Sequence, residues 1–390
     1  MTAFFDGHND SLTREDHARF VGGREGGHLD LPRMAAAGMR GGIFAVFIRN
    51  PETADWQPAK SNRPGGAGPA PELEHGYAAA ASTVAAGRLL EMEADGKMRV
   101  GRTIADIDAA AGGAGGDATD GAADAAAESA GGDEAEGAGG DAEGGDAEGV
   151  GVDTADATAG APPVAVLHLE GAEAIDADLE ALDFWYAAGL RSLGPVWSRP
   201  NAFGHGVRFR YPSTPDIGPG LTEAGKALAR RCAELGIVFD LAHMNEAGFW
   251  DTAELGAAPL VVSHAGVHAI CPNSRCLTDA QIDAVGQTGG LVGIVYAPAF
   301  LRPDGKNQPS GTPLDLIVRH AAHVAERIGV EHVALGSDFD GTEVPDTLGD
   351  VTGVPTLLDE FAKHGFSESE IESIAWSNWR RTLARCWNEA

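Results

Sequence analysis

The chain has few cysteines and few basic residues, and it lacks a long apolar run. Its four cysteines include no Cys-x-x-Cys pair, so we interpret them as reduced thiols of a cytosolic protein. Lys and Arg number 28 against 58 for Asp and Glu, and the formal charge of -30 argues against a nucleic acid or an anionic membrane as partner. Because no stretch reaches the ~18 apolar residues of a membrane span and no signal peptide is visible, we expect a cytoplasmic protein.

One low-complexity stretch is markedly acidic. Residues 111–161 are almost wholly Gly, Ala, Asp, Glu and Thr, with no aromatic residue and no Lys or Arg, a composition that cannot bury enough apolar surface to become ordered. The 13 acidic residues from Asp117 to Asp156 leave a charge of -17 on the rest of the chain. We therefore predict one domain over residues 1–390, a disordered insertion over residues 111–161, and an acidic, salt-adapted surface.

Outside this stretch, apolar runs of strand length alternate with helical patterns, which is typical of βα units and a parallel sheet. We count eight candidate strands: Phe4–Asp6, Gly42–Phe47, Val164–Glu170, Ser192–Val196, Ile237–Leu241, Leu260–Ser263, Leu291–Val295 and Val333–Gly336. Eight such strands predict a closed α/β barrel of the TIM (β/α)8 type. We expect helices at Thr103–Ala110, Leu221–Leu235, Thr278–Thr288, Leu314–Ile328 and Glu368–Trp387.

The first strand ends in a possible metal site. In Phe4-Phe5-Asp6-Gly7-His8-Asn9-Asp10, a histidine and a carboxylate lie two residues apart at the end of an apolar run. Residues i and i+2 of an extended segment point to the same face, so His8 and Asp10 can bind one cation. A nitrogen and an oxygen ligand suit zinc or a similar divalent ion.

Four later strands also end in polar residues. Glu170 follows one apolar run and is a candidate bridge between two metals, while His243 and His264 follow two others and fit a second metal. Asp338 ends the last strand, inside a glycine-bounded turn, and we expect it beside the metals. A single histidine at a strand end is most simply a hydrogen-bonded loop residue. Five occurrences are harder to dismiss, because active-site residues of a parallel barrel come from the C-terminal ends of several strands.

Other histidines have simpler interpretations. His268 lies four residues after His264, a spacing at which two histidines of a helix could bind one metal ion, but the other candidate ligands already account for the site. His168 shares a face with Glu170 and is most simply a packed strand residue. We expect His320 and His323 on the surface of an outer helix. Tyr296 and Phe300 follow the seventh strand and could either line a substrate pocket or pack in the core.

These motifs together resemble the membrane dipeptidase (renal dipeptidase) family, peptidase family M19. The resemblance rests on Asp6-Gly7-His8-Asn9-Asp10, Leu169-Glu170-Gly171, Asp240-Leu241-Ala242-His243, Val262-Ser263-His264 and Gly336-Ser337-Asp338-Phe339-Asp340-Gly341, and on Arg275 eleven residues after His264. It implies an amidohydrolase-type TIM barrel with two zinc ions. His8 and Asp10 would hold the first ion, His243 and His264 the second, and Glu170 would bridge them.

The resemblance also implies how a substrate binds. Arg275 matches the arginine that pairs with the substrate carboxylate, for which a bidentate guanidinium is suited. Asp338, preferred to Asp340 because it comes first after the strand, matches the aspartate that receives the substrate amino group and moves protons. Trp197 stands where many members have a histidine that contacts substrate, which leaves side-chain and stereochemical preference open. A homodimer is the family expectation.

The implied reaction is hydrolysis of a dipeptide by a hydroxide held between the metals, since coordination lowers the pKa of water from about 15.7 toward ~7. The alternative within enzymes is another binuclear amidohydrolase that acts on a cyclic amide, a lactam or an N-acyl amino acid, and it would not need Arg275. The alternative outside enzymes is a silent barrel that binds metal or small peptides. The glycines form no phosphate cradle, so nucleotide binding has little support.

Overall fold

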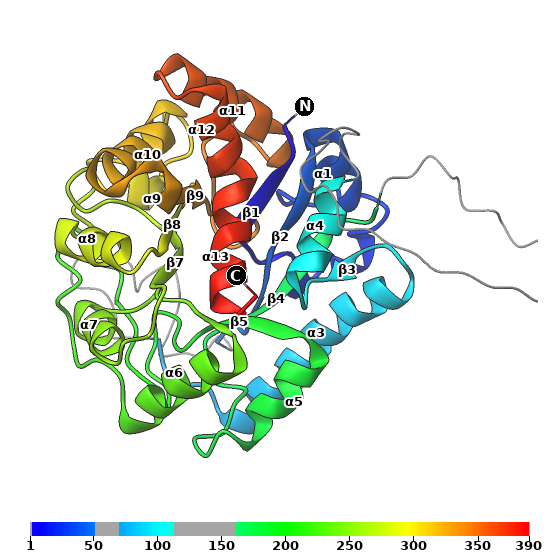
Figure 1. Cartoon of the computed structure of the whole chain (residues 1–390), viewed down its shortest axis with the longest axis vertical. Helices are drawn as coiled ribbons and strands as arrows, with labels where there is room; N and C mark the ends of the chain where they lie inside the picture. Colours follow the sequence, from blue (N-terminus) through cyan, green and yellow to red (C-terminus); the bar gives the residue numbers. More distant parts are fainter. Residues whose placement is uncertain (1, 51–69, 113–160, 390) are drawn as a thin grey trace, which may run out of the picture.

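The computed structural model describes residues 2–50, 70–112 and 161–389, and its strands run parallel (Figure 1). Five of them pair in the order β1 (Phe4–Asn9), β2 (Met39–Phe47), β4 (Val164–Glu170), β5 (Leu190–Gly194) and β6 (Val238–Phe239). Three more pair in the order β7 (Val261–Ala265), β8 (Leu291–Ile294) and β9 (Val333–Leu335). A short strand, β3 (Arg99–Val100), pairs with β4 at the side.

Single bridges close these two sheets into a ring. Asp240, just after β6, bridges to Val261 of β7, and Asn9 of β1 bridges to Phe339 after β9. At the second junction the Asp338 N–H donates to the His8 carbonyl at 3.0 Å. The predicted α/β barrel is therefore confirmed in the part of the chain that the structure describes, with eight strands in the ring, each within a few residues of its predicted position.

The strands are almost wholly buried, as expected for a parallel sheet covered on both faces, and their partly exposed residues are Arg40, Phe47, Arg99 and Arg191. One set of strand side chains, including Phe5, Ile43 and Val166, packs together with Trp376 and Trp379 from the C-terminal helical region. The remaining strand side chains pack against the outer helices, which surround the ring in Figure 1. The barrel therefore has apolar cores on both sides of its strands.

Several helices, though not all, carry an N-terminal side-chain cap. The side chain of Thr222, for example, accepts from the Gly225 N–H at the start of α6, and Thr278 begins α8 with a capping box. The helices are α1 (Leu31–Ala37), α3 (His75–Ala94), α4 (Ile104–Ala111), α5 (Glu180–Ala188), α6 (Glu223–Leu235), α7 (Glu246–Glu254), α8 (Asp279–Gln287), α9 (Pro298–Leu301), α10 (Asp315–Ile328), α11 (Val354–Lys363), α12 (Glu368–Glu372) and α13 (Asn378–Cys386).

The expected continuous helix at Glu368–Trp387 is interrupted. A π-helical turn, Ser373–Ser377, separates α12 from α13. Through this turn both Trp376 and Trp379 reach Phe5, each with its ring centroid 5.9 Å from the phenyl ring. Helix α13 lies across the ring of strands in Figure 1, on the side where the strands begin, and leaves their C-terminal ends open.

Two other expectations concern the acidic insertion and the absence of a membrane-spanning segment. The acidic insertion predicted for residues 111–161 lies almost wholly outside the described residues, so it stays a prediction. Among the described helices, none combines the length and the apolar character that crossing a membrane requires.

Candidate metal centre

Four of the predicted ligands meet at the C-terminal ends of their strands. Glu170, the last residue of β4, lies between three imidazoles that come from β1, the segment after β6, and β7. One carboxylate oxygen is 3.6 Å from His8 Nε2, and the other is 2.9 Å from His243 Nε2 and 4.0 Å from His264 Nε2. Segments separated by more than 250 residues therefore direct their side chains to one carboxylate.

The potential ligand atoms form two main groups. Glu170, His243 and His264 each offer one atom, all within 4.8 Å of one another. His8, Asp10 and Asp338 form a second group by the same measure. A third combination, His8 with Asp240 and His264, overlaps both groups. Glu170 of the first group lies 3.6 Å from His8 of the second, so the two candidate ligand groups adjoin at this carboxylate.

Serine hydroxyls fix the orientation of two imidazoles. Ser198 Oγ lies 2.9 Å from Nδ1 of His243, and Ser263 Oγ lies 2.8 Å from Nδ1 of His264. Buried Asp240 accepts from Ser263 through both its N–H and its hydroxyl, at 2.8 and 2.5 Å. These bonds leave the two Nε2 atoms 3.1 Å apart and facing Glu170. Such supporting contacts keep ligand imidazoles in place.

Several buried polar atoms at this point have no hydrogen-bond partner. Both ring nitrogens of His8 and Oδ1 of Asp10 are among them. Leaving such groups unpaired is costly, and buried polar atoms are nearly always satisfied by a partner or an ion. Imidazole nitrogens and carboxylate oxygens are the ligand types of zinc and related divalent ions. The residues present therefore fit a metal centre.

The pKa values reflect crowding of buried negative charge. Burial lowers the pKa of His8, but the carboxylates of Glu170, Asp10 and Asp338 outweigh it and raise the pKa to about 10. Burial and the neighbouring Glu170 raise the pKa of Asp10 well above its ordinary value. Burial lowers the pKa of His243 to about 3, which keeps its ring neutral as a ligand must be. The cluster therefore favours a cation.

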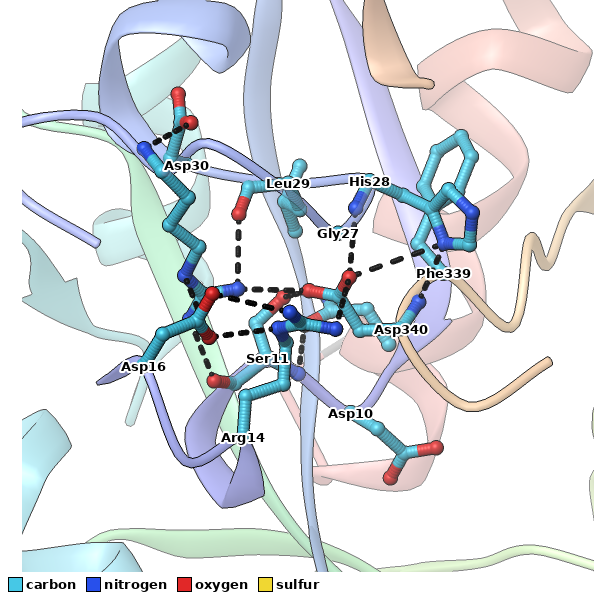
Figure 2. A network of polar contacts seen from close by, with 12 residues as sticks. Asp10, Ser11, Arg14, Asp16, Gly27, His28, Leu29, Asp30, Phe339 and Asp340 are labelled. Atoms are coloured by element: carbon cyan, nitrogen blue, oxygen red, sulfur yellow. Dashed lines mark hydrogen bonds and ion pairs between the residues drawn. The ribbon is translucent and has the colours of Figure 1, made fainter. Parts of the chain in front are cut away.

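Asp338 and Asp340 belong to the turn that follows β9 but have different partners. Burial raises the pKa of Asp338 to about 7, a value suited to accepting and returning a proton near neutral pH. Asp340 instead accepts hydrogen bonds from Arg24 and Ser11, among others, away from the metal ligands (Figure 2). The geometry therefore favours Asp338 as the acid or base.

A cavity of about 520 Å³ opens onto the ligands. Phe47, Trp197, Phe209 and Phe300 form its aromatic wall, and the Trp197 ring centroid lies 6.0 Å from that of His243. The rest of its lining comprises Asp10, Glu170, Arg210, Tyr211, His243, Asn273, Ala299, Gly305, Asn307, Asp338, Gly341, Thr342 and Glu343. The cavity therefore joins the ligand groups to an apolar surface that includes Trp197.

Arg275 is buried beneath this wall, and Tyr296 is not part of it. The Arg275 guanidinium lies 5.9 Å from the Phe300 ring and donates to the His264 carbonyl, while its Nε and Nη1 have no partner. Tyr296 is 1% exposed and packs edge-on against Phe339. The expected pocket lining by Phe300 thus agrees with the structure, whereas the position of Tyr296 does not support its predicted contact with substrate.

The remaining histidines take structural positions. His168 is a packed strand residue, hydrogen-bonded to Ser192 at 2.8 Å, and His268 bonds to the Ser213 carbonyl rather than to the ligands. The surface position expected for His320 is wrong. This side chain is fully buried, where it accepts from the Val267 N–H and bonds to the Leu301 carbonyl.

Comparisons with known proteins identify similar sequences and similar structures. The sequence model of the membrane dipeptidase family, peptidase family M19, matches residues 152–389. An uncharacterized protein from the PQQ-III 3′ region of Acinetobacter calcoaceticus is 33% identical over 333 residues, which cover 83% of this chain and 89% of that protein.

Two solved structures are similar over the whole chain. One is dipeptidase AC, a metallopeptidase of family M19, with 36% identity, a TM-score of 0.81, and coverage of 100% of this chain and 99% of its own. The other is a metallopeptidase from Rhodobacter sphaeroides liganded with a phosphinate mimic of the dipeptide L-Ala-D-Ala. It shows 37% identity, a TM-score of 0.83 and coverage of 99% of both chains.

Proposed function

The chain belongs to the membrane dipeptidase family, peptidase family M19, and is a metallo-dipeptidase; we propose that it uses two zinc ions to hydrolyse the peptide bond of dipeptides. The observation that carries this proposal is the meeting of two ligand groups at Glu170, next to a buried arginine with unpaired N–H groups. His8 and Asp10 would hold one ion and His243 and His264 the other.

In the proposed hydrolysis, the metals and the protein side chains would have different roles. Zinc ions bound here would acidify a water molecule and polarise the scissile carbonyl. Asp338, with its pKa of about 7, accepts the proton of the attacking water and returns it to the departing amine. The aromatic wall excludes bulk water from one side of the cavity and strengthens the electrostatic interactions within it.

Charged groups at either end of a bound dipeptide would select dipeptides, with Arg275 lying beneath the aromatic wall rather than among the residues that line the cavity. Arg275 lies near the ligands with two free donors, and a guanidinium pairs well with the terminal carboxylate of a substrate. Asp338 and its neighbouring carboxylates provide the negative charge that a free amino group needs. A chain longer than two residues would place an uncharged peptide group at one of these ends.

The Rhodobacter relative carries a mimic of L-Ala-D-Ala, which suggests that this chain also accepts a D residue in the second position. The test is a panel of L,L and L,D dipeptides with their N-acetyl and C-amide derivatives, assayed with and without added zinc. We expect zinc-dependent cleavage of free dipeptides and at least about tenfold slower cleavage of blocked ones. Absence of cleavage of every free dipeptide by the zinc-loaded protein would refute the proposal.

A further inference from the structure

The turn that carries Asp338 adopts an unusual backbone conformation. Asp338 has a φ of +62° and Asp340 a φ of +67°, so two non-glycine residues of one turn lie in the left-handed region. Such conformations persist only where the surrounding structure holds them. Ser337, at the beginning of the turn, donates from its N–H and its hydroxyl to the two oxygens of Asp6, which anchors that end to β1.

The other end of the turn is anchored by a buried ion pair between Arg24 and Asp340. Figure 2 shows Asp340 with its further partners Ser11 and His28. Asp340 Oδ2 accepts from Arg24 Nη1 at 2.8 Å and from Ser11 Oγ at 2.7 Å, and its Oδ1 accepts from the His28 N–H at 2.7 Å. The side chains of Arg24 and Asp340 are both completely buried. An ion pair in this setting is strong only with good geometry, which these hydrogen bonds provide.

The same guanidinium also holds the segment after β1. Arg24 Nη2 donates to the Ser11 carbonyl at 2.8 Å, and Nη1 donates to the Leu29 carbonyl at 3.0 Å. Ser11 directly follows Asp10, and Asp340 comes two residues after Asp338. One ion pair therefore connects the backbone next to Asp10 with the turn of Asp338, although neither Arg24 nor Asp340 is among the residues lining the cavity.

We propose that Arg24 and Asp340 form a positioning pair that sets the carboxylates of Asp10 and Asp338 relative to each other. This inference rests on the proposed function. Asp10 and Asp338 contribute atoms to the same ligand group with His8, so a shift of either backbone segment would change the site. A shift of about 1 Å at a catalytic group lowers rates by about 100-fold.

The central variant is Asp340→Asn, which keeps the shape of the side chain and removes its charge. The matched control is Asp350→Asn, because Asp350 also accepts from an arginine, Arg33 at 2.9 Å, but is partly exposed and does not contact the turn. For each variant we would measure the melting temperature, kcat and KM on a dipeptide, and retention of bound zinc during titration with a chelator.

For Asp340→Asn we expect folded protein, a kcat lowered by about 30-fold with a smaller change in KM, and loss of zinc at lower chelator concentration. Asp350→Asn should stay within about twofold of wild type in kcat and in zinc retention. If Asp340→Asn does not fold, Arg24→Lys is judged by the same criteria, because lysine keeps the charge but cannot make the same set of bonds.

Wild-type kcat and zinc retention in the folded variant would overturn the positioning role, and so would equal losses in the Asp350→Asn control. The two proposals fail separately. If the wild-type protein cleaves no dipeptide, the proposed function fails, while zinc retention still tests the positioning pair.

Discussion

Replacing Arg275 with lysine tests whether the site recognises a substrate carboxylate. The guanidinium has two buried N–H groups, on Nε and Nη1, without a partner. A hydrogen bond to a charged group contributes about 1.5–3 kcal/mol. Lysine keeps the charge but loses the planar pair of donors, so one such bond, about 2 kcal/mol, should be lost. This corresponds to about a 30-fold lower kcat/KM for a free dipeptide.

The assay compares one dipeptide with its C-terminal amide, which has no carboxylate to pair with Arg275. The variant should lose about 30-fold on the free dipeptide and less than about threefold on the amide. Arg327→Lys is the control, because Arg327 forms exposed ion pairs with Asp279 and Asp283 and should behave as wild type. Unchanged turnover of the free dipeptide by Arg275→Lys would refute carboxylate recognition and favour an amidohydrolase for cyclic amides or N-acyl amino acids.

Three further predictions concern stability and packing. Burial lowers the pKa of His320 from 6.5 to about 4, so its contribution to stability is complete above about pH 6.5 and is lost as the pH falls toward 4. Chemical denaturation measures the free energy of unfolding across this pH range. Between pH 6.5 and pH 4 it should fall by about 3 kcal/mol more in the wild type than in His320→Gln. The same pH dependence in both proteins would contradict this prediction. In Gly341→Ala, the added Cβ would lie 2.0 Å from Asp10 Oδ2 and 2.3 Å from Asp338 Oδ1. Activity should fall by about 100-fold with little change in melting temperature, and wild-type activity would show that the carboxylates can move without consequence. Because the chain carries a charge of -30, its melting temperature should rise with salt from very low ionic strength, and full stability without salt would argue against a salt-adapted surface.

The fold was predictable because each strand is a short apolar run, and five of these runs are followed at once by a polar residue. In a parallel barrel all strand ends lie on one side, so the order of His8, Glu170, His243 and His264 along the chain was enough to predict their convergence. The structure brings these four residues together. Their roles as zinc ligands stay predictions.

What the sequence did not reveal depends on contacts between distant loops. His320 follows the spacing of an amphipathic helix, but nothing local shows that its ring bonds to backbone groups near Val267 and Leu301. Tyr296 follows a strand as the ligands do, yet its ring turns into the core. The π-helical turn before α13 depends on two tryptophans packing against Phe5, a contact between the two ends of the chain.

The pairing of Arg24 with Asp340 was equally hidden, because the partners are 316 residues apart. From the local sequence, Asp338 was preferred to Asp340 only because it comes first after the strand. The distinction comes from what surrounds them: Asp340 pairs with a buried arginine and accepts a hydrogen bond from a serine, while Asp338 shares a ligand group with His8 and Asp10.

Metal content tests the central claim most directly. Active protein purified without added metal or chelator should contain close to two zinc ions per chain by elemental analysis, and Glu170→Gln should lower that number, because the bridging carboxylate is lost. Protein that hydrolyses dipeptides at full rate with almost no bound metal would contradict the account.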